Sequence, residues 1–251
     1  MTLTQARLET ALRPRPVRYL AQVESTNDLA RIWLQDGQGS GAVFVADEQI
    51  KGRGRMGHGW FAPPGTALMF SVVIVPESVD LVARAAMLGA VVVSELLDSL
   101  GIDKVGIKWP NDVQIDGRKV AGILPEAVWE GERLLGLVLG IGLNARIDFG
   151  DTDLADKATS IETMLGKSVD RLDLLVDLLG RIDRWVGQPE SDLHETWKNR
   201  LNMLGQIVTV NQPDGSVRGR AESVDERGAL LLRLEDDSVY RAVAGDIAVG
   251  T

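Results

Sequence analysis

The segment VGIKWPNDVQIDGRKVAGILPEAVWEGERLLGLVLGIGLN, residues 105–144, carries the strongest structural signal in the chain. Its apolar runs predict four consecutive strands, at 105–109, 113–116, 119–129 and 133–143. Pro110 ends the first run, and turn signals at Asp116-Gly117 and Glu130-Gly131 separate the later ones. Because Asp-Gly between two apolar runs is typical of a hairpin, we expect neighbouring strands to pair antiparallel.

The residues before this segment predict strands mixed with helices. Strands are expected at 17–23, 42–48 and 67–75, and helices at 29–34 and 79–100. Ser25, Thr26 and Asn27 precede the first helix and offer side chains that can cap it. Gly101 follows the second helix at the position of a C-terminal stop. Residues 1–16 end in two prolines and are expected to be a lead-in rather than a domain.

After this segment, the sequence pattern changes from helical to β-rich at Gly205. Leucines recur at helical spacing over 170–186, and a second amphipathic helix is expected over 191–204. Beyond Gly205, short β-rich runs alternate with turn signals, which is typical of a small β-barrel. We therefore predict an α+β fold with a mixed or antiparallel sheet, divided into domains at 1–204 and 205–251.

Composition excludes several kinds of chemistry. The 251 residues include no cysteine and two histidines, so a disulfide scaffold, a thiol nucleophile and a Cys-ligated zinc site are ruled out. The formal net charge of −9 argues against a general nucleic-acid binder. The chain has no apolar run long enough for a membrane span and no signal-peptide layout at its start. We expect a cytoplasmic protein with no membrane partner.

Four fragments imitate known nucleotide-binding or kinase motifs, at 52–57, 140–145, 148–150 and 166–168. The first matches G-x-G-x-x-G, but two prolines soon after it prevent the helix that a dinucleotide site needs. The second also lacks a clear helix, the third lacks a preceding His-Arg-Asp, and the fourth lacks the first P-loop glycine. None of the four therefore indicates the chemistry of the motif that it imitates.

The glycine-rich loop that begins at Lys51 can form an anion-binding site rather than a dinucleotide site. Lys51, Arg53 and Arg55 place three cations in an acidic chain, and glycines separate the two arginines. Guanidinium groups together with inward backbone N–H groups can bind a carboxylate or a phosphate. The alternative is a solvated basic loop, and charge contrast alone does not decide between the two.

Five motifs occur together, in this order: Ser25-Thr26-Asn27; Gln49-x-x-Gly52-Arg53-Gly54-Arg55-x-Gly57-x-x-Trp60; Lys108-Trp109-Pro110-Asn111-Asp112; Lys119-Val120-Ala121-Gly122-Ile123-Leu124; and Gly140-x-Gly142-x-Asn144. This combination resembles the biotin protein ligases over about residues 18–165. Each motif is weak alone, whereas the five in one order are specific.

The resemblance implies a class II synthetase-like core and a small C-terminal SH3-like β-barrel. It also implies two reactions: biotin and ATP form biotinyl-5′-adenylate and pyrophosphate, and the adenylate then acylates a lysine of a biotin carboxyl carrier protein. Mg²⁺ is the expected cofactor. Neither step needs a nucleophile from the enzyme, which agrees with a chain that lacks cysteine. Members of the family often form homodimers through sheet edges, so a homodimer is also a possible state.

Roles for individual residues follow from the matched motifs only. The resemblance assigns biotin binding to Ser25, Thr26, Asn27, Gln49, Gly52, Arg53, Gly54, Arg55, Lys119 and Gly122. It assigns ATP binding to Arg55, Trp60, Asn111 and Asn144, Mg²⁺ binding to Asp112, and catalysis to Lys119, Arg53 and Arg55. Arg55 matches the family position that retains the adenylate. Read without the resemblance, Lys119 is a strand-end lysine and Trp60 an ordinary core residue.

Two departures and two rival functions accompany this interpretation. His58 stands where many relatives have an arginine, and Pro125 interrupts a strand that it is expected to bend. About 16 residues precede the first predicted strand, so we expect a ligase without DNA-binding or repressor activity. The rivals are a lipoate ligase or lipoyl transferase of the same fold and a sensor that binds biotin or its adenylate without transfer.

Overall fold

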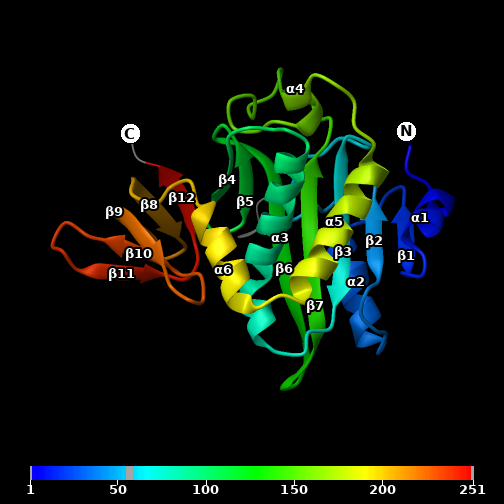
Figure 1. Ribbon diagram of the computed structural model, residues 1–251, viewed down its shortest axis with the longest axis horizontal. Coiled ribbons are helices and arrows are strands. Elements are labelled where there is room, and N and C mark those ends of the chain that lie inside the picture. The colour runs from blue at the N-terminus through cyan, green and yellow to red at the C-terminus, as the bar shows by residue number, and fades with distance from the viewer. Residues whose placement is uncertain (1, 55–58, 250–251) are drawn as a thin grey trace.

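The computed structural model describes residues 2–54 and 59–249 (Figure 1). Its larger sheet has seven strands in the order β1-β2-β3-β7-β6-β5-β4. The strands are β1 (Val17–Leu20), β2 (Val43–Ala46), β3 (Ala67–Ile74), β4 (Val105–Lys108), β5 (Asp112–Ile115), β6 (Arg118–Glu130) and β7 (Arg133–Asn144). β1 and β2 pair parallel and all other neighbours pair antiparallel, which confirms the predicted mixed sheet.

The two predicted hairpins place β7, β6 and β5 side by side in this sheet. Asp116 and Gly117 both have positive φ values, 50° and 77°, as the tight turn between β5 and β6 requires. Gly131 lies in the turn between β6 and β7, the longest strands. Pro125 pairs with Leu139 of β7, and the register shifts only later, between Val128 and Trp129, while the bend expected at this proline stays a prediction.

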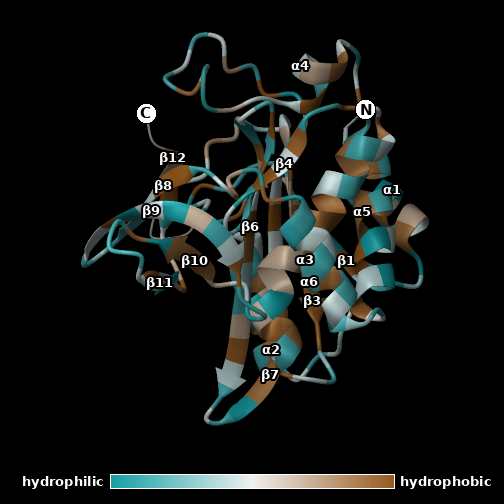
Figure 2. Cartoon of the chain, turned by 60° about the vertical axis from the view of Figure 1, so that its left-hand side comes forward, coloured by the Kyte–Doolittle hydropathy of each residue, from teal (hydrophilic) through white to brown (hydrophobic). Residues whose placement is uncertain are grey.

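Helices cover both faces of the larger sheet (Figure 1). One face carries α3 (Asp80–Ser99), α5 (Arg171–Val186) and α6 (Glu190–Asn199), and the other carries α2 (Thr26–Gln35). The short helices α1 (Gln5–Leu12) and α4 (Ile161–Leu165) lie at the periphery. Hydrophobic residues run along the strands between these layers (Figure 2). In the described part of the chain, no helix is long and apolar enough to cross a bilayer.

Strand alternation divides β3 between two environments. Leu68, Phe70 and Val72 join the main core under α3 and α5, whereas Val73 packs with α2 in a separate cluster. Ser71 shares the α2 side, because successive side chains of a strand point to opposite faces. The same alternation sends Gly140 and Gly142 of β7 to the α2 side, where small residues leave space above the sheet.

A second, antiparallel sheet follows at the C-terminal end. Its order is β11-β10-β9-β8-β12, with β8 (Ile207–Gln212), β9 (Gly215–Val224), β10 (Leu230–Arg233), β11 (Val239–Ala242) and β12 (Asp246–Val249). Val210, Leu230 and Ile247 from this sheet belong to the same buried cluster as the main core. The α+β class is confirmed, and the boundary between 204 and 205 stays a prediction.

Some elements differ from the sequence-based expectation. α1, α4 and β12 were not expected, because each is short and depends on its surroundings. In α1, for example, Leu8 and Leu12 are buried in the main core. The helix expected over 191–204 ends at Asn199, because the backbone then bonds to β4: the Ile107 amide donates to Arg200 O over 2.8 Å.

Candidate active site

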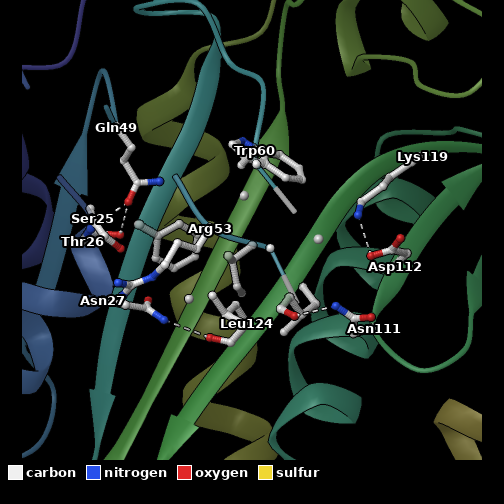
Figure 3. A pocket seen from close by; sticks show the side chains of 18 of the residues that line it. Ser25, Thr26, Asn27, Gln49, Arg53, Trp60, Asn111, Asp112, Lys119 and Leu124 are labelled. Atoms are coloured by element: carbon white, nitrogen blue, oxygen red, sulfur yellow. Dashed lines mark hydrogen bonds and ion pairs between the residues drawn. The ribbon is translucent and has the colours of Figure 1, made fainter. Parts of the chain in front are cut away.

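A cavity of about 320 Å³ lies on the side of the larger sheet that carries α2 (Figure 3). It is lined by Ser25, Thr26, Asn27, Gln49, Arg53, Gly54, Gly59, Trp60, Phe70, Lys108, Asn111, Asp112, Lys119, Gly122, Ile123, Leu124, Gly140, Ile141, Gly142 and Asp246. Ser25, Thr26, Asn27 and Gln49 lie at one end, which we call the polar end, with Arg53 beside Asn27 (Figure 3). The Lys119–Asp112 pair lies at the other, charged end together with Asn111, and Trp60 lies between the two ends (Figure 3). Strands, α2 and the glycine-rich loop therefore meet around one space, as the motifs predicted.

The polar end is a connected network of buried and half-buried side chains. The amide and hydroxyl of Thr26 donate to Gln49 Oε1 over 2.7 and 3.1 Å. Ser71 Oγ lies 2.7 Å from Thr26 Oγ1 and 2.6 Å from Asn27 Oδ1, and Asn27 Nδ2 donates to Leu124 O. Since each group holds its neighbour, the end presents a fixed set of donors and acceptors.

This network corrects one sequence-based prediction. Ser25 is the N-cap residue of α2, but it makes no side-chain capping hydrogen bond. Thr26 and Asn27, also expected to cap, lie in the first turn of the helix and bond across to other elements instead. The helix start therefore delivers these side chains to the cavity.

Glycines on β6 and β7 make room for the cavity side chains. A Cβ atom on Gly140 would lie 2.3 Å from Asn27 Oδ1, and one on Gly142 would lie 2.7 Å from Trp60 Cε2. A Cβ atom on Gly122 would meet Trp60 at 3.0 Å and Lys119 at 3.3 Å. The space that the motifs assigned to a ligand at Gly122 is thus partly filled by protein side chains.

The charged end centres on an ion pair. Lys119 Nζ lies 2.7 Å from Asp112 Oδ1 and 5.5 Å from the centre of the Trp60 ring. Asn111 Nδ2 donates to Ile123 O over 2.8 Å, which fixes this side chain beside β6. A cation flanked by a carboxylate and an aromatic face is held in place while its remaining N–H groups stay available.

Arg53 lines the cavity from the glycine-rich loop. Its guanidinium lies 2.7 Å from Asp28 Oδ1 and 3.8 Å from Glu126 Oε1. The hydrogen bond to Asp28 raises the pKa of Arg53 above its usual range. The base of the loop is closed where the Trp60 amide donates to Gly52 O over 3.0 Å. Two carboxylates therefore hold the arginine, which lies beside Asn27 (Figure 3).

Three predicted residues do not join the described lining. Arg55, and with it the departure at His58, lies outside the described residues. Gly52 lies next to the cavity but does not line it. Asn144 is the last residue of β7; its Nδ2 donates to Thr159 O over 3.0 Å and to Lys119 O over 3.3 Å, and its Oδ1 is buried without a partner.

The sequence did not identify three side chains that organise the cavity: Ser71, Asp28 and Glu126. Ser71 is the single polar residue within the apolar run of β3, and that interruption was the available signal. Asp28 and Glu126 had no comparable signal, because acidic residues on a helix and a strand are ordinary surface residues.

In the described part of the cavity, protein side chains alone do not form a metal site. Within residues 2–54 and 59–249, no three His, Cys, Asp or Glu side chains are grouped to hold an ion. Asp112 offers one carboxylate, and Lys119 already pairs with it. This arrangement fits an ion such as Mg²⁺ only if ligand phosphates and water supply most of its oxygen ligands.

Comparison with known proteins agrees with this geometry. A family model described as "Biotin/lipoate A/B protein ligase family" matches residues 19–144, and one described as "Biotin protein ligase C terminal domain" matches residues 203–250. The chain is 33% identical to the biotin–[acetyl-CoA-carboxylase] ligase of Paracoccus denitrificans, over 85% of this chain and 92% of that protein. This chain belongs to the biotin protein ligase family.

Other relatives within the biotin protein ligase family extend the comparison. The bifunctional ligase/repressor of Bacillus subtilis is 28% identical, over 97% of this chain and 77% of that protein. The solved biotin protein ligase from Aquifex aeolicus in complex with biotin and ATP is 28% identical, with a TM-score of 0.79, and the match covers 94% of this chain and 98% of that one. The fold, including the C-terminal sheet, is that of a biotin protein ligase.

Proposed function

We propose that this cavity joins biotin to ATP and passes the biotinyl group to a lysine of a biotin carboxyl carrier protein. In the first step a carboxylate oxygen of biotin attacks the α-phosphorus of ATP, and pyrophosphate leaves. In the second step the lysine amine of the carrier attacks the acyl carbon, loses a proton and displaces AMP. The chain need supply no nucleophile for either step.

The division of the cavity into two ends supports the order of the ligands along it. A ureido ring has two N–H donors and one carbonyl acceptor, which match the hydroxyl and amide groups of Ser25, Thr26, Asn27 and Gln49. The triphosphate requires cations, which Lys108 and Lys119 provide at the other end. Biotin with its carboxylate toward Lys119 satisfies both requirements.

The placement of Lys119 is the observation that carries the proposal. Its ammonium lies between the polar end and Asp112, where a carboxylate and an α-phosphate would meet (Figure 3). Bringing two anions together is the main electrostatic barrier to the first step, and a fixed cation lowers it. The alternative, a solvated strand-end lysine, does not account for an ammonium that lines the cavity beside Trp60.

Arg53 is proposed as a second cation for the same charges. Its present partner, Asp28, also accepts from Arg31 over 3.0 Å, so Asp28 remains neutralised if Arg53 turns to a ligand. Gly54 allows close approach of the backbone to the ligand. The role of Arg55 in retaining the adenylate and those of Gly52, Gly122 and Asn144 stay predictions from the family motifs.

Trp60 and Asn111 are proposed to contact the nucleotide, Trp60 by stacking and Asn111 by hydrogen bonding. Mg²⁺, held by Asp112 together with phosphate oxygens, would neutralise charge on the triphosphate when bound. A homodimer, a cytoplasmic location and the lack of repressor activity are likewise predictions.

The test is incubation of the chain with biotin, Mg-ATP and an apo carrier domain, followed by mass spectrometry of the carrier. We expect an ATP-dependent mass gain of one biotinyl group, lost when the acceptor lysine is replaced by arginine. No gain would contradict the proposal. A parallel reaction with lipoate should give no product, and a lipoyl product without a biotinyl one would favour the lipoate ligase alternative.

A further inference from the structure

Trp109 links the charged end of the cavity to the second sheet. It lies two residues before Asn111, is 1% exposed, and its indole Nε1 donates to Gly228 O over 2.8 Å. Gly228 belongs to the turn at residues 225–229 that joins β9 to β10. The bond thus connects positions 119 residues apart in the sequence.

The turn at residues 225–229 is built as a rigid element. The Asp225 carboxylate accepts from the backbone amides of Arg227 and Ala229 over 2.9 Å each, and from Arg241 Nε over 2.6 Å. The Asp225 backbone carbonyl accepts from the Gly228 amide over 2.8 Å. A carboxylate that ties both the turn and β11 together leaves the carbonyl of Gly228 in a fixed position.

The same turn packs against α3 and α6, two of the helices that cover the larger sheet. Gly228 has a φ of +80°, and a Cβ atom there would lie 2.3 Å from Met87 Cε of α3 and 3.6 Å from Trp197 Cη2 of α6. The backbone conformation favours glycine here, and a side chain at this position would also displace the terminal methyl of Met87. The acceptor for Trp109 is consequently fixed relative to α3 as well as to the second sheet.

The position of Trp109 determines where the residues that follow it lie, and these residues line the cavity. Asn111 and Asp112 line it, and the Ile123 amide donates to the Asn111 carbonyl over 3.1 Å. Asp112 in turn pairs with Lys119. At the polar end, by contrast, Thr26 and Asn27 bond to Gln49, Ser71 and Leu124, which belong to the larger sheet or the loop after β2. The link through Trp109 therefore reaches the charged end directly and the polar end only through the sheet.

We propose that Trp109 is a positioning residue. Through its bond to Gly228, in the 225–229 turn of the second sheet, it sets the geometry of the nucleotide end of the cavity and not that of the biotin end. This rests on the proposed function in one respect, the assignment of ATP to the charged end. The C-terminal sheet thereby acquires a defined role, because its 225–229 turn holds the segment that presents Asn111 and Asp112.

The experiment uses Trp109→Phe in the full chain, which keeps an aromatic ring and removes the indole donor. Calorimetry measures the Kd values for biotin and for Mg-ATP, and pyrophosphate release measures KM for each substrate. We expect ATP affinity to fall about tenfold, as for a buried carbonyl left without its donor, with the Kd for biotin within about twofold of wild type. Trp33→Phe is the matched control, because Trp33 Nε1 also donates to a glycine carbonyl, Gly39 O at 2.9 Å, away from the cavity.

Gly228→Ala is the second variant, with Gly101→Ala as its control. Gly101 has a similar φ of +78°, but no atom lies within 4 Å of its Cβ position. Both variants should lose stability through backbone strain, which thermal unfolding measures. Only Gly228→Ala should also weaken ATP binding while leaving biotin binding unchanged.

The outcomes separate this inference from the proposed function. Unchanged ATP affinity in Trp109→Phe, or equal losses for ATP and biotin that follow the loss of stability, would overturn the positioning role. A wild-type chain that binds Mg-ATP but forms no adenylate would contradict the proposed function, and calorimetry would still test the inference. A wild-type chain that binds no ATP would overturn both.

Discussion

Lys119 and Asp112 form an ion pair of 2.7 Å across the charged end of the cavity. The two side chains come from β6 and β5, which the Asp116-Gly117 turn joins, so the hairpin itself sets their separation. Trp60, which follows the glycine-rich loop, lies beside the same ammonium. The pair therefore keeps a cation in the cavity before any ligand is bound.

Replacing Lys119 by methionine should cripple adenylate formation and leave the fold intact. Loss of one fixed charge from a transition state costs on the order of 3 kcal/mol, which corresponds to a rate lower by about 10²-fold or more. Biotin-dependent pyrophosphate release is the measurement. Lys104→Met removes a similar Lys–Asp pair, in which Lys104 lies 3.0 Å from Asp116 at the turn of the same hairpin, and should change nothing. Wild-type rates in Lys119→Met would remove its assigned role.

Arg53→Gln should lower the same rate. Within the described part of the glycine-rich loop, Arg53 is the cation that lines the cavity. Arg31→Gln provides the control. Arg31 bonds to the same oxygen of Asp28 but does not line the cavity. We expect a loss of roughly 10²-fold in the first variant and less than about twofold in the second. Equal losses in both would indicate that only the charge balance around Asp28 matters.

Gly140→Ala should weaken biotin binding more than ATP binding. The new Cβ atom would displace Asn27, whose oxygen lies 2.3 Å from that position, and so disturb the polar network. Gly180→Ala lies within α5 with no atom near its Cβ position, so it should stabilise the fold by up to about 1 kcal/mol without kinetic effect. Titration calorimetry with biotin distinguishes the two, and an unchanged biotin Kd in Gly140→Ala would contradict the assignment of the polar end.

The raised pKa of Tyr19 predicts that the folded protein loses stability at alkaline pH. Burial and the hydrogen bond to Asp47, over 2.7 Å, raise the pKa of Tyr19 to about 12. Since the unfolded chain has a tyrosine pKa of about 10, this contribution to stability is complete below that pH and is lost as pH rises toward about 12. Urea unfolding at several pH values should show a steeper loss for wild type than for Tyr19→Phe. Parallel slopes would contradict the prediction.

Those parts of the fold that depend on local signals were predictable from the sequence. Asp116-Gly117 specified its hairpin because only a few residues tolerate positive φ, and the leucine spacing of α5 specified a buried face. The short helix α1 was missed although most of its residues are strong helix formers and Thr4 caps it, because the two prolines that follow indicated only a lead-in.

The candidate site was predictable to the extent that its residues lie in contiguous motifs. Lys119, Trp60 and Asn111 all line the cavity, as expected from the resemblance. The partners of these residues were not predictable. Asp28 holds Arg53 across 25 residues, and the bond from Trp109 to Gly228 spans two sheets. Such contacts depend on tertiary packing, which leaves no periodicity in the sequence.

The most direct test of the central claim is a single-turnover reaction of the wild-type chain with biotin and Mg-ATP in the absence of carrier, followed by native mass spectrometry. We expect a species heavier by biotinyl-5′-adenylate, formed with release of pyrophosphate, absent in Lys119→Met, and discharged when apo carrier is added. A chain that binds biotin and ATP together but never forms the adenylate would contradict the claim that this cavity joins them.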